Sequence, residues 1–311
     1  MTRYLVLLGA AGLLLASGCR KDDVIDCAPS VATATSLADF TRHNSVASQA
    51  FTLVLGQTRM LTTASGATLT FPANGFVVPG GGVATGTAQV RVREIYTVPD
   101  MVLSNIPTDI VRRGQMLVSG GEFNIQVWQN GIRLQLSPQQ QVTVQAPVPA
   151  DQDTTPQYVW KQPSAVMTSD TAGWQFASAQ QVLSLPGFYR AGLPLDSIGW
   201  WNIDQLWHMY STASVASVVV ATPANPLTET RVYLRPVGFN GLARLAPTDG
   251  TGTRWTRTMP VGASMLAVVL QSVGGQLYYG TQQVIIQTNL VVTPPLTAVS
   301  EAEALRLIRL L

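Results

Sequence analysis

Few side chains in this sequence of 311 residues have types and spacings that could do chemistry. The chain has two cysteines, Cys19 and Cys27, and two histidines, His43 and His208. Histidines this far apart, without a cysteine pair nearby, do not form a recognisable zinc-binding pattern. A serine nucleophile needs a base beside it, and the sequence has no Gly-x-Ser-x-Gly or His-Glu-x-x-His motif. We therefore predict no catalytic residue, no metal and no cofactor.

Cys19 is the reactive side chain with the clearest context. It ends an N-terminal stretch in which Arg3 precedes an apolar run, Leu5 to Leu15, and three small residues. This order of charge, apolar segment and small residues is typical of a secretory leader. The apolar stretch is too short for the about 20 residues that span a membrane. We expect residues 1–18 to be a cleaved signal peptide, with a secretory signal cut elsewhere or a buried apolar helix as alternatives.

The run Leu15-Ala16-Ser17-Gly18-Cys19 resembles the lipobox of bacterial lipoproteins. This resemblance implies cleavage before Cys19, diacylglycerol on its sulfur and a fatty acid on its new amino group, so that the membrane would be a partner. The next four residues, Arg20-Lys21-Asp22-Asp23, are similar to the export signal of surface lipoproteins of the Bacteroidota. That similarity implies the outer membrane and display at the cell surface. A solvated linker is the alternative interpretation of the same four residues.

The composition argues against a nucleic acid as a partner. The formal net charge of +2 falls to +1 without residues 1–18, because Arg3 is the one charged residue among them. Proteins that bind nucleic acids carry a strongly basic field, whereas this chain balances 19 Lys and Arg against 17 Asp and Glu, with Lys21 and Lys161 as its two lysines. If Cys19 carries lipid, Cys27 has no partner within the chain, and the fold must be stable without a disulfide. Cys27 could pair between two chains, although a lone unreactive cysteine is the more common outcome.

Short runs of alternating apolar and polar residues, separated by turn residues, predict an all-β fold. The clearest lies between Phe123 and Ala146, where the dipeptide Asn130-Gly131 suits a type I′ turn between two strands. Residues 19–48 show no sustained period, and we expect them to be a flexible linker from the lipid anchor. The prolines around residues 149–157 predict a second linker. Ser300 with Glu303 predicts a capped helix over residues 299–311.

Two segments resemble known modules. The sequence Gly66-Ala67-Thr68-Leu69-Thr70-Phe71-Pro72-Ala73-Asn74-Gly75-Phe76, followed by Gly86 to Val92, looks like the start of the β-sandwich module of zonula-occludens proteins, ankyrins and netrin receptors. Many Bacteroidota lipoproteins have a similar module, and such modules bind other proteins. The motif Gly199-Trp200-Trp201-Asn202 resembles one that follows this module in the same lipoproteins. The second half is similar to carboxypeptidase-regulatory-like (transthyretin-like) sandwiches.

These resemblances imply two β-sandwich domains in tandem, over residues 49–148 and 158–298. Some relatives of the first module cleave themselves at His-Phe-Ser or His-Phe-Thr, and neither tripeptide occurs in this chain. The expected domain order is therefore a signal peptide, a linker, two sandwiches and a short C-terminal helix.

Two further sets of residues are candidates for a site. Trp200, Trp201 and Trp207 form the densest aromatic group and could stack on a glycan or anchor a partner, although core packing is the usual role of such rings. Glu94 has the inward phase of its strand, and a buried carboxylate needs a partner. We expect Arg112 or Arg113, or a bulge that redirects the side chain, with a catalytic acid as the alternative.

Together these patterns predict a lipid-anchored protein of the cell envelope with a non-catalytic binding or scaffolding role. The ligand would be a protein or a glycan. The alternative function is an envelope hydrolase that acts on polysaccharide, but the sequence offers no second carboxylate that clearly faces Glu94.

Overall fold

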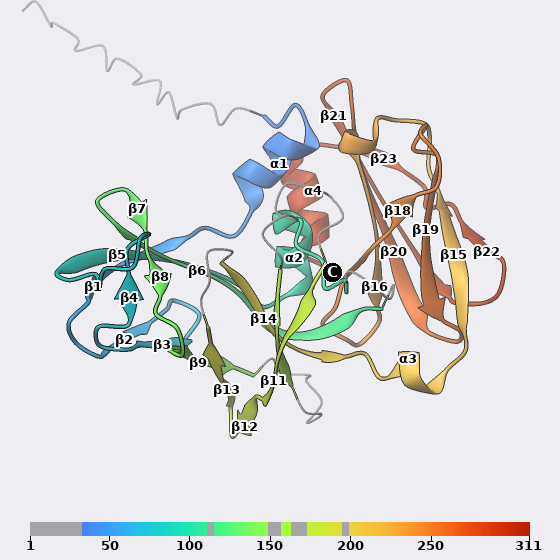
Figure 1. Ribbon diagram of the computed structural model, residues 1–311. Coiled ribbons are helices and arrows are strands. Elements are labelled where there is room, and N and C mark those ends of the chain that lie inside the picture. The colour runs from blue at the N-terminus through green and yellow to red at the C-terminus, as the bar shows by residue number, and fades with distance from the viewer. Residues whose placement is uncertain (1–32, 111–114, 149–156, 163–172, 195–198) are drawn as a thin grey trace, which may run out of the picture. The chain divides into compact units, whose positions relative to one another are not determined.

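The computed structural model describes residues 33–110, 115–148, 157–162, 173–194 and 199–311 (Figure 1). The predicted signal peptide, Cys19, Cys27 and the export residues Lys21, Asp22 and Asp23 lie outside the described residues. Arg112 and Arg113, the expected partners of Glu94, also lie outside them. Among the described residues, no helix is long and apolar enough to span a membrane.

The described chain is mostly β-strand, so the prediction of an all-β fold class is confirmed. Sheet 1 contains, in spatial order, β1 (Gln49–Val54), β5 (Thr87–Ile95), β6 (Leu117–Gln129), β14 (Trp200–Leu206), β10 (Tyr158–Lys161) and β11 (Gln175–Gln181). The short strand β7 (Ile132–Arg133) also pairs with β6. Sheet 2 has the order β12 (Leu183–Leu185), β13 (Phe188–Leu193), β9 (Val142–Pro147), β3 (Thr68–Phe71) and β2 (Arg59–Thr62).

The C-terminal strands form two more sheets. Sheet 3 has the order β18 (Ala246–Pro247), β19 (Arg254–Pro260), β15 (Val215–Ala221) and β22 (Leu290–Val292). Sheet 4 has the order β17 (Ala243–Arg244), β16 (Thr230–Pro236), β20 (Ser264–Val273), β21 (Gln276–Ile285) and β23 (Thr297–Val299). A two-stranded ribbon joins β4 (Phe76–Val77) to β8 (Gln135–Leu136).

Three hydrophobic cores hold these sheets. The first core joins inward residues of sheets 1 and 2, among them Val90, Ile125, Leu69 and Val144. The third core joins sheets 3 and 4 through residues such as Val218, Trp255, Val232 and Val269. The second core joins helices to strands of sheets 1 and 4, and its members include Phe40, Met101, Ile308, Leu117, Trp200 and Val268.

The strands between residues 158 and 206 are paired differently from the predicted domain boundaries. Strand β14 pairs with β6, with Trp201 opposite Phe123, and β13 pairs with β9, with Ala191 opposite Val144. These strands therefore complete sheets 1 and 2 instead of starting the second half. Their alternation indicates which residues face inward, but it carries no information about which strand lies beside them.

The predicted turn between Phe123 and Ala146 has the expected backbone. Asn130 and Gly131 have φ angles of 51° and 77°, as both central positions of a type I′ turn require. The return strand is shorter than predicted, because β7 ends at Arg133 and β8 leaves sheet 1 to pair with β4.

Part of the expected linker 19–48 is a helix, which corrects that prediction. Helix α1 (Leu37–Asn44) begins after Ser36, whose hydroxyl accepts a hydrogen bond of 3.0 Å from the Asp39 backbone N–H. Leu37 and Phe40 are fully buried in the second core. A capped helix with two buried side chains is an ordered part of the fold.

Three more α-helices and one 3₁₀ turn complete the described elements: α2 (Val98–Ser104), α3 (Met209–Thr212), η2 (Leu227–Glu229) and α4 (Glu301–Ile308). Helix α4 is the helix that the capping pattern predicts, since the Ser300 hydroxyl accepts a hydrogen bond from the Glu303 N–H at 3.1 Å. It ends three residues earlier than expected. Helix α2 was not expected, because its seven residues are too few to show a helical period.

Candidate functional site

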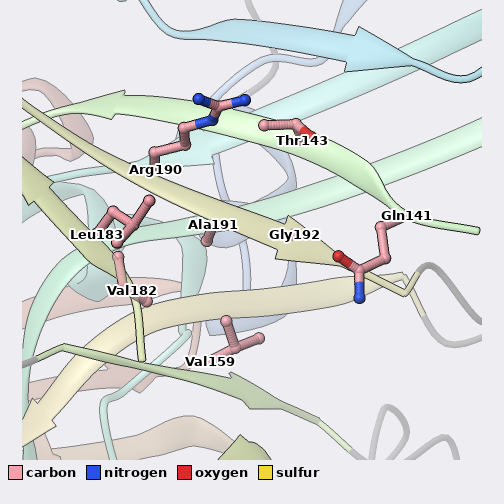
Figure 2. A pocket seen from close by; sticks show the side chains of 8 residues that line it. All are labelled: Gln141, Thr143, Val159, Val182, Leu183, Arg190, Ala191 and Gly192. Carbon is pink, nitrogen blue, oxygen red and sulfur yellow. The ribbon is translucent and has the colours of Figure 1, made fainter. Parts of the chain in front are cut away.

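The described residues form a cavity of about 370 Å³ that is lined by strands of both sheet 1 and sheet 2 (Figure 2). Its lining comes from β9, β10, β12 and β13 and from residues just before them: Gln141, Thr143, Val159, Val182, Leu183, Arg190, Ala191 and Gly192. Strands distant in sequence therefore build one concave surface, the usual form of a small-ligand site.

Three polar side chains line one part of the cavity. Thr143 lies opposite Gly192 in the pairing of β9 with β13, and Arg190 lies two residues before Gly192 on β13. Figure 2 shows the Arg190 side chain extending toward Thr143 and the Gln141 carboxamide beside Gly192. A methyl group at Gly192 would meet Gln141 Oε1 at 1.8 Å. The Gln141 carboxamide can therefore occupy this position only because residue 192 is a glycine without a side chain.

The remaining lining is apolar. Val159, Val182 and Ala191 are buried and belong to the first core. Side chains alternate along each of these strands, so each apolar residue that faces the core is next in sequence to a residue that faces outward. The cavity consequently offers a ligand one apolar side and one side with hydrogen-bond donors.

Arg190 is the charged group of this cavity. Its guanidinium is exposed and makes no hydrogen bond or ion pair with any residue that the structure describes. A guanidinium presents five N–H donors in a planar fork that matches a carboxylate. Together with the Thr143 hydroxyl and the Gln141 amide, Arg190 can hold an anionic ligand that carries hydroxyl groups.

The lining residues that the structure describes include no imidazole, thiol or carboxyl group. The described side chains of the lining can contact a ligand through hydrogen bonds, charge and apolar surface.

The structure separates the three predicted platform tryptophans. Trp200, Trp201 and Trp207 are only 5 %, 1 % and 1 % exposed, and they belong to the second, first and third cores respectively. Successive residues of a strand point to opposite faces of the sheet, which is why Trp200 and Trp201 enter different cores. The rings therefore form no common surface on which a sugar could stack.

Glu94 is buried as its phase predicts. The expected partners Arg112 and Arg113 lie outside the described residues, and three described side chains donate to Glu94. Its carboxylate accepts hydrogen bonds from Gln49 Nε2 at 2.9 Å, Thr63 Oγ1 at 3.0 Å and the Tyr96 hydroxyl at 2.9 Å. Burial and the Glu94 charge raise the pKa of Tyr96, which keeps that hydroxyl available as a donor. Three neutral donors thus satisfy the carboxylate.

Sequence reasoning missed a buried acidic pair, Glu122 and Asp204. Both side chains are fully buried, and Glu122 lies opposite Asn202 in sheet 1. The Asn202 amide donates to Asp204, and the Ser119 hydroxyl donates to Asn202 Oδ1 at 3.1 Å. Neither carboxylate oxygen of Glu122 has a hydrogen-bond partner among the described residues.

Burial raises the pKa of both carboxyl groups, and the Asp204 charge raises that of Glu122 further. The pair lies beside a distortion of sheet 1, where the register shifts between Asn202 and Asp204 and Gly121 has a φ angle of 143°. The Gly120-Gly121 dipeptide inside a strand is the sequence signal that could have indicated this bulge. Enclosure of both carboxyls keeps a substrate from reaching them.

A scan against protein-family models and a search of curated proteins found no match to this chain. Within the described ranges, no three His, Cys, Asp or Glu side chains are grouped so that they could hold a metal ion. The cavity of Figure 2 is the candidate site because it brings polar and apolar side chains of distant strands together.

Proposed function

We propose that this chain is a lipid-anchored protein of the bacterial outer membrane that binds a ligand without transforming it. The anchor would be acylated Cys19, and the similarity of Lys21, Asp22 and Asp23 to an export signal supports display at the cell surface. Several acyl chains hold a protein durably, because each buried methylene contributes about 0.8 kcal/mol.

We further propose that the fold is a pair of β-sandwiches in tandem, with a cleaved signal segment before them. The first core between sheets 1 and 2 supports one sandwich, and the third core between sheets 3 and 4 supports the other. In this proposal the first sandwich includes β10 to β14 and so reaches residue 206.

The exposed Arg190 guanidinium, which has no partner among the described residues, carries the proposal of ligand binding. An exposed arginine beside a hydroxyl, a carboxamide and an apolar wall suits an acidic monosaccharide, whose carboxylate and hydroxyls would meet the donors. The glycan ligand is therefore favoured over a protein ligand for this cavity. No contact among the described residues favours the alternative, a hydrolase of polysaccharide.

Ligand-observed NMR with the mature full-length chain in detergent micelles tests this function. The probes are glucuronate, galacturonate and their neutral parent sugars. We expect the two uronates to bind, and Arg190→Gln to weaken that binding by roughly tenfold, as loss of a charge-assisted hydrogen bond does.

Arg254→Gln is the matched control, because Arg254 is exposed and lies on β19, outside the cavity. Its binding should equal that of the unaltered protein. Failure of both uronates to bind, or equal binding by the Arg190→Gln variant, would contradict the proposed function.

A further inference from the structure

The solvent face of sheet 1 at β1, β5 and β6 has a composition unlike that of an ordinary polar sheet surface. These three strands are neighbours (Figure 1), and their outward residues alternate with inward residues of the first core. The central outward residues are two arginines, two carboxamides and one indole: Arg91, Arg93, Asn124, Gln126 and Trp128. We call these five the arginine–amide face.

Strand register brings the five side chains together. Arg91 lies opposite Gln126, and Arg93 lies opposite Asn124, in the antiparallel pairing of β5 with β6. Side chains of directly opposed residues have Cβ atoms about 5 Å apart and lie on one side of the sheet. Each guanidinium therefore has a carboxamide as its neighbour.

Hydrogen bonds fix the polar groups along β6. The Gln126 amide donates to Asn124 Oδ1 at 2.9 Å, and the Trp128 indole N–H donates to Gln126 Oε1 at 3.1 Å. The Arg91 guanidinium carbon lies 5.9 Å from the centre of the Trp128 ring, within the range of a cation–π interaction. These contacts orient the donors before any ligand arrives, which lowers the entropy cost of binding.

The two arginines of this face have no anionic partner among the described residues. Arg91 contacts the Trp128 ring, and Arg93 makes no hydrogen bond or ion pair with a described side chain or backbone group. Arg93 is half-buried, and its burial lowers the pKa of its guanidinium. A partly desolvated cation without a counterion gains more from an arriving anion than a fully hydrated one.

We propose that the arginine–amide face binds an acidic polysaccharide, with the uronate carboxylates on Arg91 and Arg93 and the sugar hydroxyls on the carboxamides. Charge complementarity selects this partner, since the five residues of the arginine–amide face include two guanidiniums and no carboxylate. A planar carboxylate matches the arginine fork in a bidentate pair. An open sheet face suits a long chain that crosses several strands, and it is a second site apart from the cavity.

A nucleic acid fits this face less well. Its binding grows with the number of phosphates that a protein neutralises, and this face has two arginines on a chain of formal net charge +2. Carboxamides next to guanidiniums match the alternating carboxylates and hydroxyls of a polyuronate.

Affinity electrophoresis of the mature full-length chain in detergent tests the proposal. The probes are polygalacturonate and its fully methyl-esterified form, which has the same backbone without charge. We expect polygalacturonate to retard the protein and the ester to have little effect. Arg91→Gln and Arg93→Gln should each raise the dissociation constant by roughly tenfold.

Arg59→Gln is the matched control, because Arg59 is exposed on β2 of sheet 2 and receives the same substitution. Arg190→Gln in the cavity should also leave retardation unchanged, so the two sites can fail separately. Arg93→Lys retains charge but loses the fork, and we expect it to lie between the Gln variant and the unaltered protein. Circular dichroism checks that each variant is folded.

Three outcomes would overturn the proposal. They are equal retardation by the methyl ester, equal binding by both Gln variants and the unaltered protein, and tighter binding of single-stranded DNA or dextran sulfate than of polygalacturonate.

Discussion

Glu122 is a fully buried residue whose two carboxylate oxygens both lack a hydrogen-bond partner among the described residues. A buried carboxylate without a donor costs several kcal/mol if it stays ionised. Burial and the Asp204 charge raise the pKa of Glu122 above its ordinary value. The folded protein therefore holds a proton on this pair at a pH where the unfolded chain has lost it.

This proton makes stability depend on pH in a defined direction. The raised pKa contributes stability that is fully present below the ordinary value of 4.5 and is lost as pH rises through the folded value. Each unit of that rise corresponds to about 1.4 kcal/mol. Urea denaturation between pH 5 and 9 should show the free energy of unfolding falling with pH, and Glu122→Gln should make this fall shallower.

The control for this prediction is Glu303→Gln on the surface of α4. Arg306 lowers the pKa of Glu303, so the stability linked to Glu303 is lost only as pH falls through that lowered value. Its pH profile above pH 5 should match that of the unaltered protein. An equally steep fall in the Glu122→Gln variant would show that this carboxyl is not the group that titrates.

Asp109 provides a second prediction at the scale of residues. Its Oδ1 lies 2.8 Å from Arg257 Nη2, and its Oδ2 accepts a hydrogen bond of 2.9 Å from the Arg244 backbone N–H. Burial nevertheless raises the pKa of Asp109 to about 6. Asp109→Ala leaves the Arg257 charge buried, and we expect a loss of about 3 kcal/mol or more in urea denaturation.

The exposed pair Asp39 and Arg42 is the comparison for this loss. Exposed ion pairs contribute little because water screens them, so Arg42→Ala should change the unfolding midpoint far less. Equal losses of unfolding free energy in both variants would mean that the buried pair stabilises the fold no more than the exposed pair.

Among the secondary-structure elements, helix α1 shows whether residues before β1 contribute to the stability of the fold. Glu229 accepts a hydrogen bond from the Leu37 N–H at 2.9 Å, and the Arg231 guanidinium donates to the Leu37 carbonyl at 3.1 Å. Phe40→Ala should cost about 3 to 5 kcal/mol, as truncation of a fully buried ring does. Asn44→Ala at the end of the same helix retains the buried ring and should cost less. Unchanged thermal unfolding of Phe40→Ala would support the flexible linker that the composition predicts.

The elements also show which features the sequence predicts and which it leaves open. Alternation identified inward residues such as Val90 and Ile125, and Asn130-Gly131 identified its turn, because both signals are local. The pairing of β14 with β6 is a contact between distant segments, and no local pattern encodes it. Ser36, three residues before Asp39, is a capping signal for α1. We did not predict this helix because its eight residues are too few to show a clear helical repeat of apolar residues.

The candidate site was hidden from the sequence for the same reason. Gln141 and Thr143 lie about fifty residues from Arg190, and only the pairing of β9 with β13 brings them together. The tryptophans, by contrast, are close in sequence and separate in space. Closeness along a strand therefore predicted the wrong cluster, since neighbouring strand residues face opposite sides.

At the scale of the whole molecule, Cys19→Ser tests the anchor. If Cys19 carries lipid, the unaltered mature protein should sediment with membranes and have a mass that includes the acyl groups. The serine variant lacks the sulfur that forms the thioether, so we expect it in the soluble fraction without added mass. Cys27→Ser is the matched control and should stay with the membranes. A membrane-bound Cys19→Ser variant would contradict lipid anchoring at this residue.

The pairing of strands in sheets 1 and 2 predicts where a fragment must end if it is to fold into these two sheets. A chain ending at residue 148 keeps β1 to β9 but loses β14, which covers one edge of β6, and β13, which covers one edge of β9. The first core would also lose Val159, Ala191 and Trp201. We expect this fragment to bind a hydrophobic dye and to lack a cooperative thermal transition, because unpaired edges and an open core favour aggregation.

A fragment ending at residue 206 restores every one of those strands and is the matched comparison. Cooperative unfolding of the shorter fragment would place the boundary at residues 149–157 after all.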